Sequence, residues 1–337
     1  MRIALVTGTD AADAEEQRGL ATALRDAGQQ VSKHAMDAAQ VADVRAAVPG
    51  FARSLRSAWS RQRPDVVHAF GWAGGLAALA AARDAGLPVV TAFGSLAVTE
   101  RRHGPGPLQP ERARLEHAIG AASRAVIAAS SEEAVDLVRM GVSRRRVHVI
   151  PVGVDTSVFT PEGPASPHAR GAERRAEKAK PRVVTAANID DEQSVLLARA
   201  VAAVPGAQLI ACPGSTSRGR ELATLLRSAD VFVHVPAYSP RGTECLQAMA
   251  CGVPVVVSAA GAHTDMVIEG TTGMLVPAGR PDLLAPRIRQ LLNHPVLRKA
   301  CGVAAADRAQ SRYNRDRITA ETLAVYEAAA HAQPLAA

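Results

Sequence analysis

The chain has few aromatic residues and few cysteines for its length. Aromatic side chains make up 3% of its 337 residues, although hydrophobic residues make up 47%, so small aliphatic side chains must build the core. The cysteines show no C-x-x-C spacing and no nearby histidine, which excludes the common zinc-binding patterns and favours reduced thiols in a core. These cysteines are Cys212, Cys245, Cys251 and Cys301.

Long hydrophobic runs are also missing. No stretch approaches the roughly 18 apolar residues that a membrane span needs. The opening segment MRIALVTG lacks the apolar region and cleavage site of a signal peptide. We therefore expect a strand at the N-terminus and a cytoplasmic protein without a transmembrane segment, while peripheral contact with a membrane stays open.

The net charge of +7 suits an anionic partner such as a nucleotide, a phosphorylated acceptor or a lipid headgroup. Much of the excess is local, in the arginines at 144–146 and the basic run at 170–182, so an ordinary basic surface explains it as well. No basic stripe with interleaved aromatics and no nucleic-acid motif is present. We expect no nucleic-acid partner.

Strand-forming runs alternate with helix-forming segments along the chain, which predicts an α/β fold with parallel sheets. We expect Ser131 to cap a helix at 132–140. The expected strands are 3–6, 31 onward, 65–68, 88–93, 125–129, 147–151, 182–186, 208–212, 231–235 and 253–257, and the expected helices are 15–27, 71–86, 111–119, 132–140, 194–204, 220–228, 246–250 and 316–330.

Residues 162–181 divide the chain into two series of strands and helices. This segment is rich in charge, Pro and Gly and has no apolar residue other than alanine, which is typical of a flexible linker. The sequence therefore predicts a first domain at 1–161, a linker at 162–181, a second domain at 182–312 and a terminal helical segment at 313–337.

The most informative stretch is SPRGTECLQAMACGVPVVVSAAGAHTDMVIEGTTGMLV, which starts at Ser239. A helix ending at Cys251-Gly252 precedes the β-branched run Val253–Val257 and a loop with Gly261. Such loops beyond strand ends receive phosphates and ribose in α/β folds.

This stretch resembles the donor half of family 4 glycosyltransferases, whose usual wording is close to E-P-F-G-L-x-x-L-E-A-M-A-x-G-x-P-V-V. The phrase P-x-G-V-D-x-x-x-F-x-P, at 151–161, is similar to the same family. The strings that begin at Pro64 and Ala129 resemble actinobacterial members that build mycothiol or transfer sugars onto inositol phosphate.

The resemblance implies an α/β fold of two Rossmann-like, doubly wound domains that face a cleft, known as GT-B. The domain at 1–161 would bind the acceptor, the domain at 182–312 would bind the donor nucleotide, and the segment at 313–337 would return to the first domain. Only ten residues separate VPGAQLIACPG from LLRSADVF, so we expect a shortened second domain.

The resemblance also assigns candidate site residues. Gly94 and Ser239 occupy positions where the family has a histidine and a glutamate near the reacting sugar, so the catalytic residues of this chain are left unassigned. Gln247 occupies the position of a ribose-binding glutamate. The expected donor-binding residues are Asn188, Gln193, Gly242, Thr243, Glu244 and Gln247, and the expected acceptor-binding residues are Gly8, Ser95, Arg101, Arg102 and His103.

Several of these assignments have an alternative. Gly8 also fits an ordinary turn, Glu244 fits a solvated surface position, and Arg101, Arg102 and His103 fit a solvated basic turn. Asp190-Asp191 is better interpreted as a helix entry than as a metal site, so we expect no metal and no cofactor. The donor substrate would be a nucleoside-diphosphate sugar.

Two functions fit these residues. The first is a hexosyltransferase that transfers a sugar from a nucleoside-diphosphate sugar to a small-molecule or phosphorylated acceptor with retention of configuration. The second is a catalytically inactive pseudo-glycosyltransferase that acts as a binding or regulatory partner, as a homodimer or paired with an active paralogue.

Overall fold

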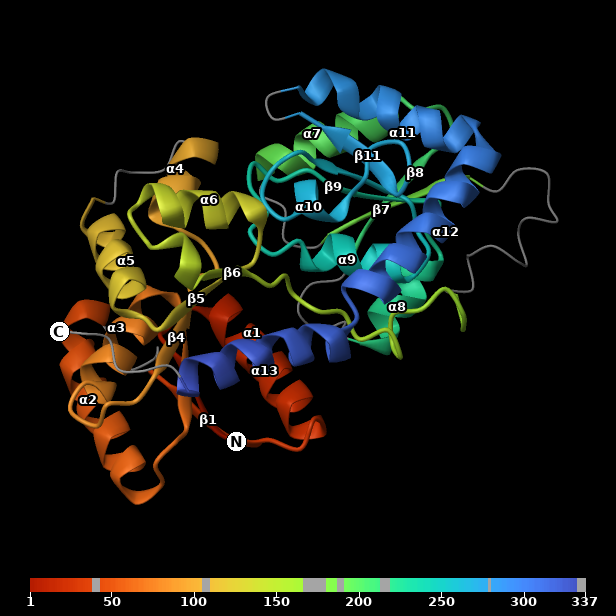
Figure 1. Ribbon diagram of the computed structural model, residues 1–337. Coiled ribbons are helices and arrows are strands. Elements are labelled where there is room, and N and C mark those ends of the chain that lie inside the picture. The colour runs from red at the N-terminus through yellow and green to blue at the C-terminus, as the bar shows by residue number, and fades with distance from the viewer. Residues whose placement is uncertain are drawn as a thin grey trace. The chain divides into compact units, whose positions relative to one another are not determined.

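A computed structural model divides the chain into two compact units (Figure 1). One unit contains Met1–Pro151 together with Asp316–Ala337, and the other contains Val152–Arg315. Most of the predicted linker at 162–181 lies outside the described residues. The structure describes residues 1–37, 43–104, 110–165, 180–186, 191–212, 219–277 and 280–331.

The first unit is built around a parallel sheet of six strands in the order β2-β1-β3-β4-β5-β6. The clusters of buried side chains on it come from α1 and α13, from α2 and α3, and from α5 and α6. Its strands are β1 (Arg2–Thr7), β2 (Gln30–Ala35), β3 (Val66–Phe70), β4 (Val89–Ala92), β5 (Ala125–Ala128) and β6 (Val147–Val149). Its helices are α1 (Ala11–Asp26), α2 (Val44–Arg61), α3 (Gly71–Ala82), α4 (Ala97–His103), α5 (Pro110–Ala122), α6 (Ser131–Arg139) and α13 (Arg315–His331), with a 3-10 turn at Arg144–Arg146.

The second unit has a parallel sheet of five strands in the order β11-β10-β9-β7-β8. Buried residues of α8, α9 and α12 pack on one face, and those of α7 and α11 on the other. The strands are β7 (Arg182–Thr185), β8 (Gln208–Ala211), β9 (Val231–His234), β10 (Val255–Ser258) and β11 (Gly273–Val276). The helices are α7 (Asp191–Ala202), α8 (Arg220–Arg227), α9 (Thr243–Ala250), α10 (His263–Met266), α11 (Leu284–Asn293) and α12 (Pro295–Arg312), with a 3-10 turn at Pro281–Leu283.

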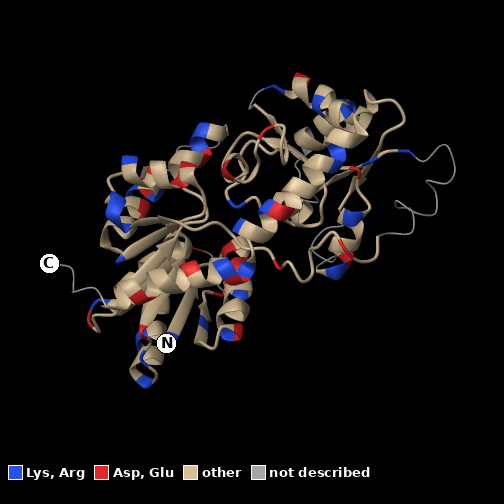
Figure 2. Cartoon of the chain, turned by 45° about the vertical axis from the view of Figure 1, so that its right-hand side comes forward, with Lys and Arg blue, Asp and Glu red and all other residues tan. Residues whose placement is uncertain are grey.

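The central strands are almost entirely aliphatic, as expected for sheets covered on both faces. Figure 2 shows the charged residues mainly on helices and loops, while most strands of both sheets are free of them. The predicted α/β class with two doubly wound units is therefore confirmed.

Several element boundaries differ from the sequence predictions because capping residues lie elsewhere. Helix α1 begins at Ala11 rather than at 15, since the Asp10 side chain accepts hydrogen bonds from the N–H groups of Ala12 and Asp13. Ser130, not Ser131, caps α6, because its Oγ accepts from the N–H of Glu133. Helices α2, α4, α10, α11 and α12 and strand β11 were not predicted.

The terminal helix α13 packs against the sheet of the first unit. Ile318, Val325 and Tyr326 join Ile3 and Leu5 in one buried cluster. The hydroxyl of Tyr326 lies 2.5 Å from Nδ1 of His68, on β3. This helix therefore completes the core of a unit whose other elements lie more than 160 residues earlier in the chain.

Within the second unit, the segment at 152–156 is hydrogen-bonded to the segment at 313–315. The N–H of Val154 donates to the carbonyl of Tyr313 at 2.8 Å, and the N–H of Arg315 donates to the carbonyl of Val154 at 3.0 Å. The guanidinium of Arg315 lies 2.9 Å from the carboxylate of Asp155. These bonds join the two stretches where the chain enters and leaves this unit.

Candidate functional site

The sheet of the second unit has a topological switch point between β7 and β9. From β7, the chain adds β8 on one side, and β9, β10 and β11 lie on the other. In open α/β sheets, ligands bind beyond the carboxyl ends of the strands at such a point. The loops at 235–242 and 259–262 follow β9 and β10 at this edge, so they are the place to look for a site.

Helix α9 begins directly after the first of these loops. Gly242 has φ of 63°, in the left-handed region, and no side chain caps the helix. The expected donor-binding residues Gly242 and Thr243 thus lie where backbone N–H groups and the helix dipole favour an anion.

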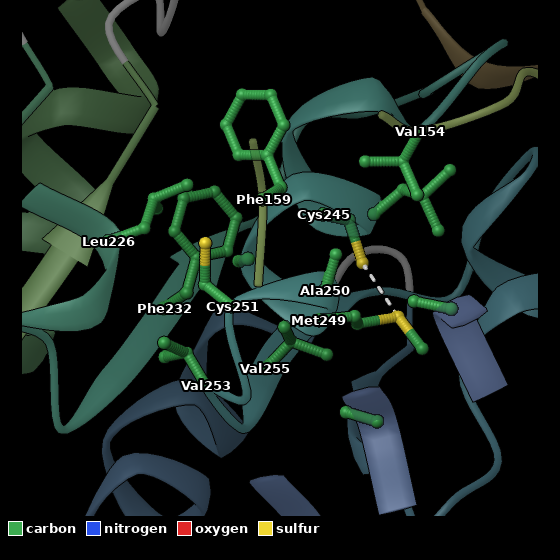
Figure 3. Packing of buried hydrophobic residues seen from close by; sticks show 14 of the residues in the cluster. Val154, Phe159, Leu226, Phe232, Cys245, Met249, Ala250, Cys251, Val253 and Val255 are labelled. Carbon is green, nitrogen blue, oxygen red and sulfur yellow. Dashed lines mark hydrogen bonds between the residues drawn. The ribbon is translucent and has the colours of Figure 1, made fainter. Parts of the chain in front are cut away.

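The inner face of α9 is fixed by packing. Cys245, Leu246, Ala248 and Met249 are fully buried in the core of this unit. Figure 3 shows Cys245 and Met249 side by side, with their sulfur atoms 3.9 Å apart. Glu244 and Gln247, three residues apart and each half-buried, therefore lie on neighbouring turns of a rigid helix.

The loops after β9 and β10 are locked to each other. The carbonyl of Ser239 accepts a hydrogen bond from the N–H of Ala262 at 2.9 Å. A Cβ atom at Gly261 would lie 2.1 Å from that carbonyl oxygen, and Gly261 has φ of 62°, so only glycine fits. Ser239 itself is buried, with an exposed fraction of 5%. It provides no carboxylate at the position where the family has a glutamate.

Sequence reasoning missed a pair of buried histidines at the same edge. His234 ends β9 and His263 begins α10, and their ring centroids are 5.4 Å apart. Nδ1 of His263 donates to the carbonyl of Ser258 at 3.1 Å, which leaves Nε2 as an acceptor. Burial lowers the pKa of His263 to about 3 and also lowers the pKa of His234, so both rings are neutral.

Neither histidine is fully satisfied. Nδ1 of His234 and Nε2 of His263 have no hydrogen-bond partner among the residues that the structure describes. In the sequence, each of these histidines follows a run of small or apolar residues. That pattern matches no binding motif, so it gave no reason to select them.

The remaining donor candidates, Asn188 and Gln193, follow β7 in the sequence. Gln193 is half-buried near the start of α7. Asn188 lies outside the described residues, as does Asp190. The expected roles of Asn188 and Gln193 against a diphosphate stay predictions.

In the first unit, the glycine candidates have structural explanations. A Cβ at Gly8 would lie 2.9 Å from Cβ of Ala73 on α3, so Gly8 allows the loop after β1 to approach this helix. Gly94 has φ of 69°, a conformation that side-chain-bearing residues rarely adopt.

The loop after β4 is held by an ion-pair network. Oγ of Ser95 donates to Glu100 at 2.7 Å, and the guanidinium of Arg112 donates to the Ser95 carbonyl at 2.9 Å and also bonds Glu100 and Glu116. The buried carboxylate of Glu116 accepts from the N–H of Ala97 at 3.0 Å, at the start of α4. Ser95 is thus part of a fixed loop.

The basic candidates on α4 differ in their surroundings. Arg102 donates to Asp136 at 2.8 and 2.5 Å and to Glu132 at 2.8 Å, and the hydrogen bond with Asp136 raises its pKa. Nε2 of His103 lies 2.6 Å from Glu132. Arg101 is exposed. The side chains of Arg102 and His103 are therefore already bonded to carboxylates of the same unit.

The described residues contain neither a metal-binding cluster nor a membrane-spanning helix. Over those ranges, no group of three or more His, Cys, Asp or Glu residues is arranged to hold a metal ion. None of the described helices is long and apolar enough to cross a membrane.

Comparison with known proteins places these features in a family. A family described as Glycosyltransferase Family 4 matches residues 5–158, and one described as Glycosyl transferases group 1 matches residues 210–308. A D-inositol 3-phosphate glycosyltransferase of Xylanimonas cellulosilytica is 31% identical over 80% of this chain and 73% of its own length. This chain belongs to glycosyltransferase family 4.

Other relatives agree. The family 4 chain is 28% identical to an alpha-maltose-1-phosphate synthase of Mycolicibacterium smegmatis, over 83% of each chain. Among solved structures, sucrose-phosphate synthase of Thermosynechococcus elongatus matches with a TM-score of 0.82 at 20% identity, covering 97% of this chain and 98% of that one. HepE of Anabaena, in complex with UDP and glucose, matches with a TM-score of 0.75 at 15% identity, covering 97% and 99%. These likenesses confirm the expected GT-B fold.

Proposed function

We propose that this family 4 protein binds a nucleoside-diphosphate sugar in its second unit and transfers the sugar to a small, phosphorylated acceptor with retention of configuration. The observation that carries the proposal is the uncapped N-terminus of α9 behind the left-handed Gly242, at the switch point of a parallel sheet. Backbone N–H groups there bind phosphate without a cation. Similarity to a D-inositol 3-phosphate glycosyltransferase and to an alpha-maltose-1-phosphate synthase supports the same substrate class.

The binding step is assigned to α9 and its neighbours. The α9 N-terminus would hold a diphosphate oxygen, and the amide of Gln247 would hydrogen-bond the ribose hydroxyls. Retaining transfer then requires the acceptor to attack on the donor's own face while the departing diphosphate is stabilised by the helix dipole. No metal or cofactor takes part in this scheme.

A non-catalytic binding or regulatory module is the second candidate. It is favoured by Gly94 and Ser239, which leave the two family catalytic positions without an imidazole or a carboxylate. In that case the protein would bind the sugar nucleotide and act on a partner, such as an active paralogue.

Ligand-induced stabilisation separates the candidates. Thermal unfolding is measured with UDP, ADP and GDP and with UDP-glucose, ADP-glucose and GDP-mannose, because a ligand of the native state raises the unfolding temperature by mass action. Release of the diphosphate is then followed with inositol phosphate as the acceptor. Stabilisation with release supports the transferase, stabilisation without release supports the binding module, and no stabilisation by any nucleotide contradicts both.

Replacing Gln247 tests the assigned site. Gln247→Ala is expected to weaken binding of the stabilising nucleotide by about 1 kcal/mol, the contribution of one hydrogen bond. Gln310→Ala is the matched control, since Gln310 is exposed on α12 of the same unit. If Gln247→Ala and Gln310→Ala change nucleotide binding equally, the nucleotide does not contact Gln247.

A further inference from the structure

Helix α12 is fixed to the second unit by its inner face. Cys301 and Ala305 are buried there. The guanidinium of Arg308 donates from Nε to the carbonyl of Met266 at 2.7 Å and from Nη2 to the carbonyl of Asp265 at 2.7 Å. The helix is therefore held in one position, and its outer side chains are ordered for binding before a partner arrives.

The outer face of α12 carries a row of exposed side chains, which we call the α12 stripe. Its members are Val296, Lys299, Ala300, Val303 and Asp307. Their spacings of three, four, seven and eleven residues from Val296 place them on one side of a helix. Val296 and Val303 are 85% and 55% exposed, the two highest values among the large hydrophobic side chains of the described residues. The stripe is thus an apolar surface that the described part of the chain leaves uncovered.

The two charges of the α12 stripe lie symmetrically about Val303. Lys299 precedes Val303 by four residues and Asp307 follows it by four, which is about 6 Å along the helix axis in each direction. Among the residues that the structure describes, neither charge has an ion-pair partner. If two antiparallel copies of the helix cross at Val303, Lys299 of each copy lies level with Asp307 of the other. The charge pattern is therefore complementary to itself in the antiparallel arrangement, whereas parallel copies would oppose like charges.

We propose that the α12 stripe is the interface of a symmetric dimer, in which it packs antiparallel on the same stripe of a second copy of this chain. A two-fold axis at Val303 brings identical patches together, as in other isologous dimers. The valines of the two copies cover each other, and Lys299 and Asp307 form two ion pairs across the interface. With one cation and one anion, the stripe has no net charge that would attract an anionic membrane. The inference does not depend on nucleotide binding.

Sedimentation equilibrium of the full-length protein measures its mass as a function of concentration. One helix pair covers less than the roughly 1,200 Å² of a stable complex, so we expect a weak dimer with a Kd on the order of 100 µM. Val303→Glu should raise that Kd by about ten-fold or more, because two carboxylates would meet at the two-fold axis. Val195→Glu is the matched control, since Val195 is 53% exposed on α7 of the same unit, and it should leave the Kd unchanged.

Charge reversal tests the antiparallel arrangement. Lys299→Glu and Asp307→Lys, each alone, replace two attractive pairs by two repulsive ones, so each should raise the Kd about ten-fold. The variant with both replacements restores two attractive pairs and should return to the Kd of the wild type. An equimolar mixture of the two single variants should form a heterodimer, because all of its pairs across the interface are attractive. In a parallel arrangement, by contrast, each single reversal would leave like charges opposed and the Kd unchanged.

Several outcomes would overturn the inference. One is a wild-type protein that stays monomeric up to about 1 mM, and another is a pair of single reversals that leave the Kd unchanged. If the wild type is monomeric but co-floats with vesicles of phosphatidylglycerol, an anionic membrane covers the stripe and a second copy does not. Thermal unfolding of each variant separates loss of the dimer from loss of the fold, because replacements at these exposed positions should leave the folded monomer intact.

Discussion

The hydrogen bond between Tyr326 and His68 allows a quantitative test of how the terminal helix stabilises the first unit. Both side chains are buried, with exposed fractions of 0% and 2%, and Nε2 of His68 has no partner among the described residues. In Tyr326→Phe, Nδ1 would also lose its partner and the whole imidazole would be buried without a hydrogen bond. The expected loss is about 1–3 kcal/mol in the free energy of unfolding, the cost of an unsatisfied buried polar group.

Tryptophan fluorescence reports on this unit alone, because both tryptophans of the chain, Trp59 and Trp72, lie in it. Urea unfolding followed by this signal should shift to lower urea in Tyr326→Phe. The double variant with His68→Phe should recover much of the loss, since neither polar group remains. Tyr313→Phe is the matched control, because that hydroxyl donates to the carbonyl of Asp265 in the other unit. If the losses in the free energy of unfolding caused by His68→Phe and by Tyr326→Phe simply add in the double variant, the reasoning is refuted.

Three further outcomes are expected. Burial lowers the pKa of His68 to about 3, so between about pH 6.5 and 3 the unfolded chain binds a proton at this histidine that the folded chain does not. The free energy of unfolding should therefore decrease as the pH is lowered through that window, by up to ~1.4 kcal/mol per pH unit. Tryptophan-detected urea unfolding at several pH values should show a shallower dependence in the variant with both His68→Phe and Tyr326→Phe, and an unchanged dependence would contradict the assignment. Gly261→Ala should destabilise the second unit by more than the roughly 1–3 kcal/mol of a left-handed residue, and calorimetry should show a smaller loss for Gly206→Ala, where φ is 77° and nothing lies within 4 Å of the added Cβ. Excess EDTA should leave nucleotide binding unchanged, and a loss restored by magnesium or manganese would show that the metal-free scheme is wrong.

The sequence predicted the sheets better than the details of the site. The valines at 253 and 255–257 predict a buried strand because β-branched side chains suit a sheet that is covered on both faces. Strand β10 is found at Val255–Ser258, two residues later than the predicted start. Helix α2 was missed, and it contains Pro49, a residue that usually ends a helix. Its N-terminal hydrogen bonds depend on Asp43, whose side chain accepts from the N–H of Arg45.

The surroundings of the site residues were harder to predict from the sequence, because they depend on elements that are distant along the chain. The pattern TERRH predicts cations, but only the folded chain shows that Arg102 and His103 face Asp136 and Glu132 of α6. His234 and His263 are 29 positions apart, and only the adjacency of β9 and β10 brings their rings together.

The return of α13 to the first unit has a consequence for synthesis on the ribosome. The residue that bonds His68 follows it by 258 positions, and the whole second unit is translated in between. The unit that is translated first is therefore completed last. Until α13 emerges, the apolar face that receives Ile318 and Val325 stays uncovered, which makes the nascent chain a natural client for chaperones.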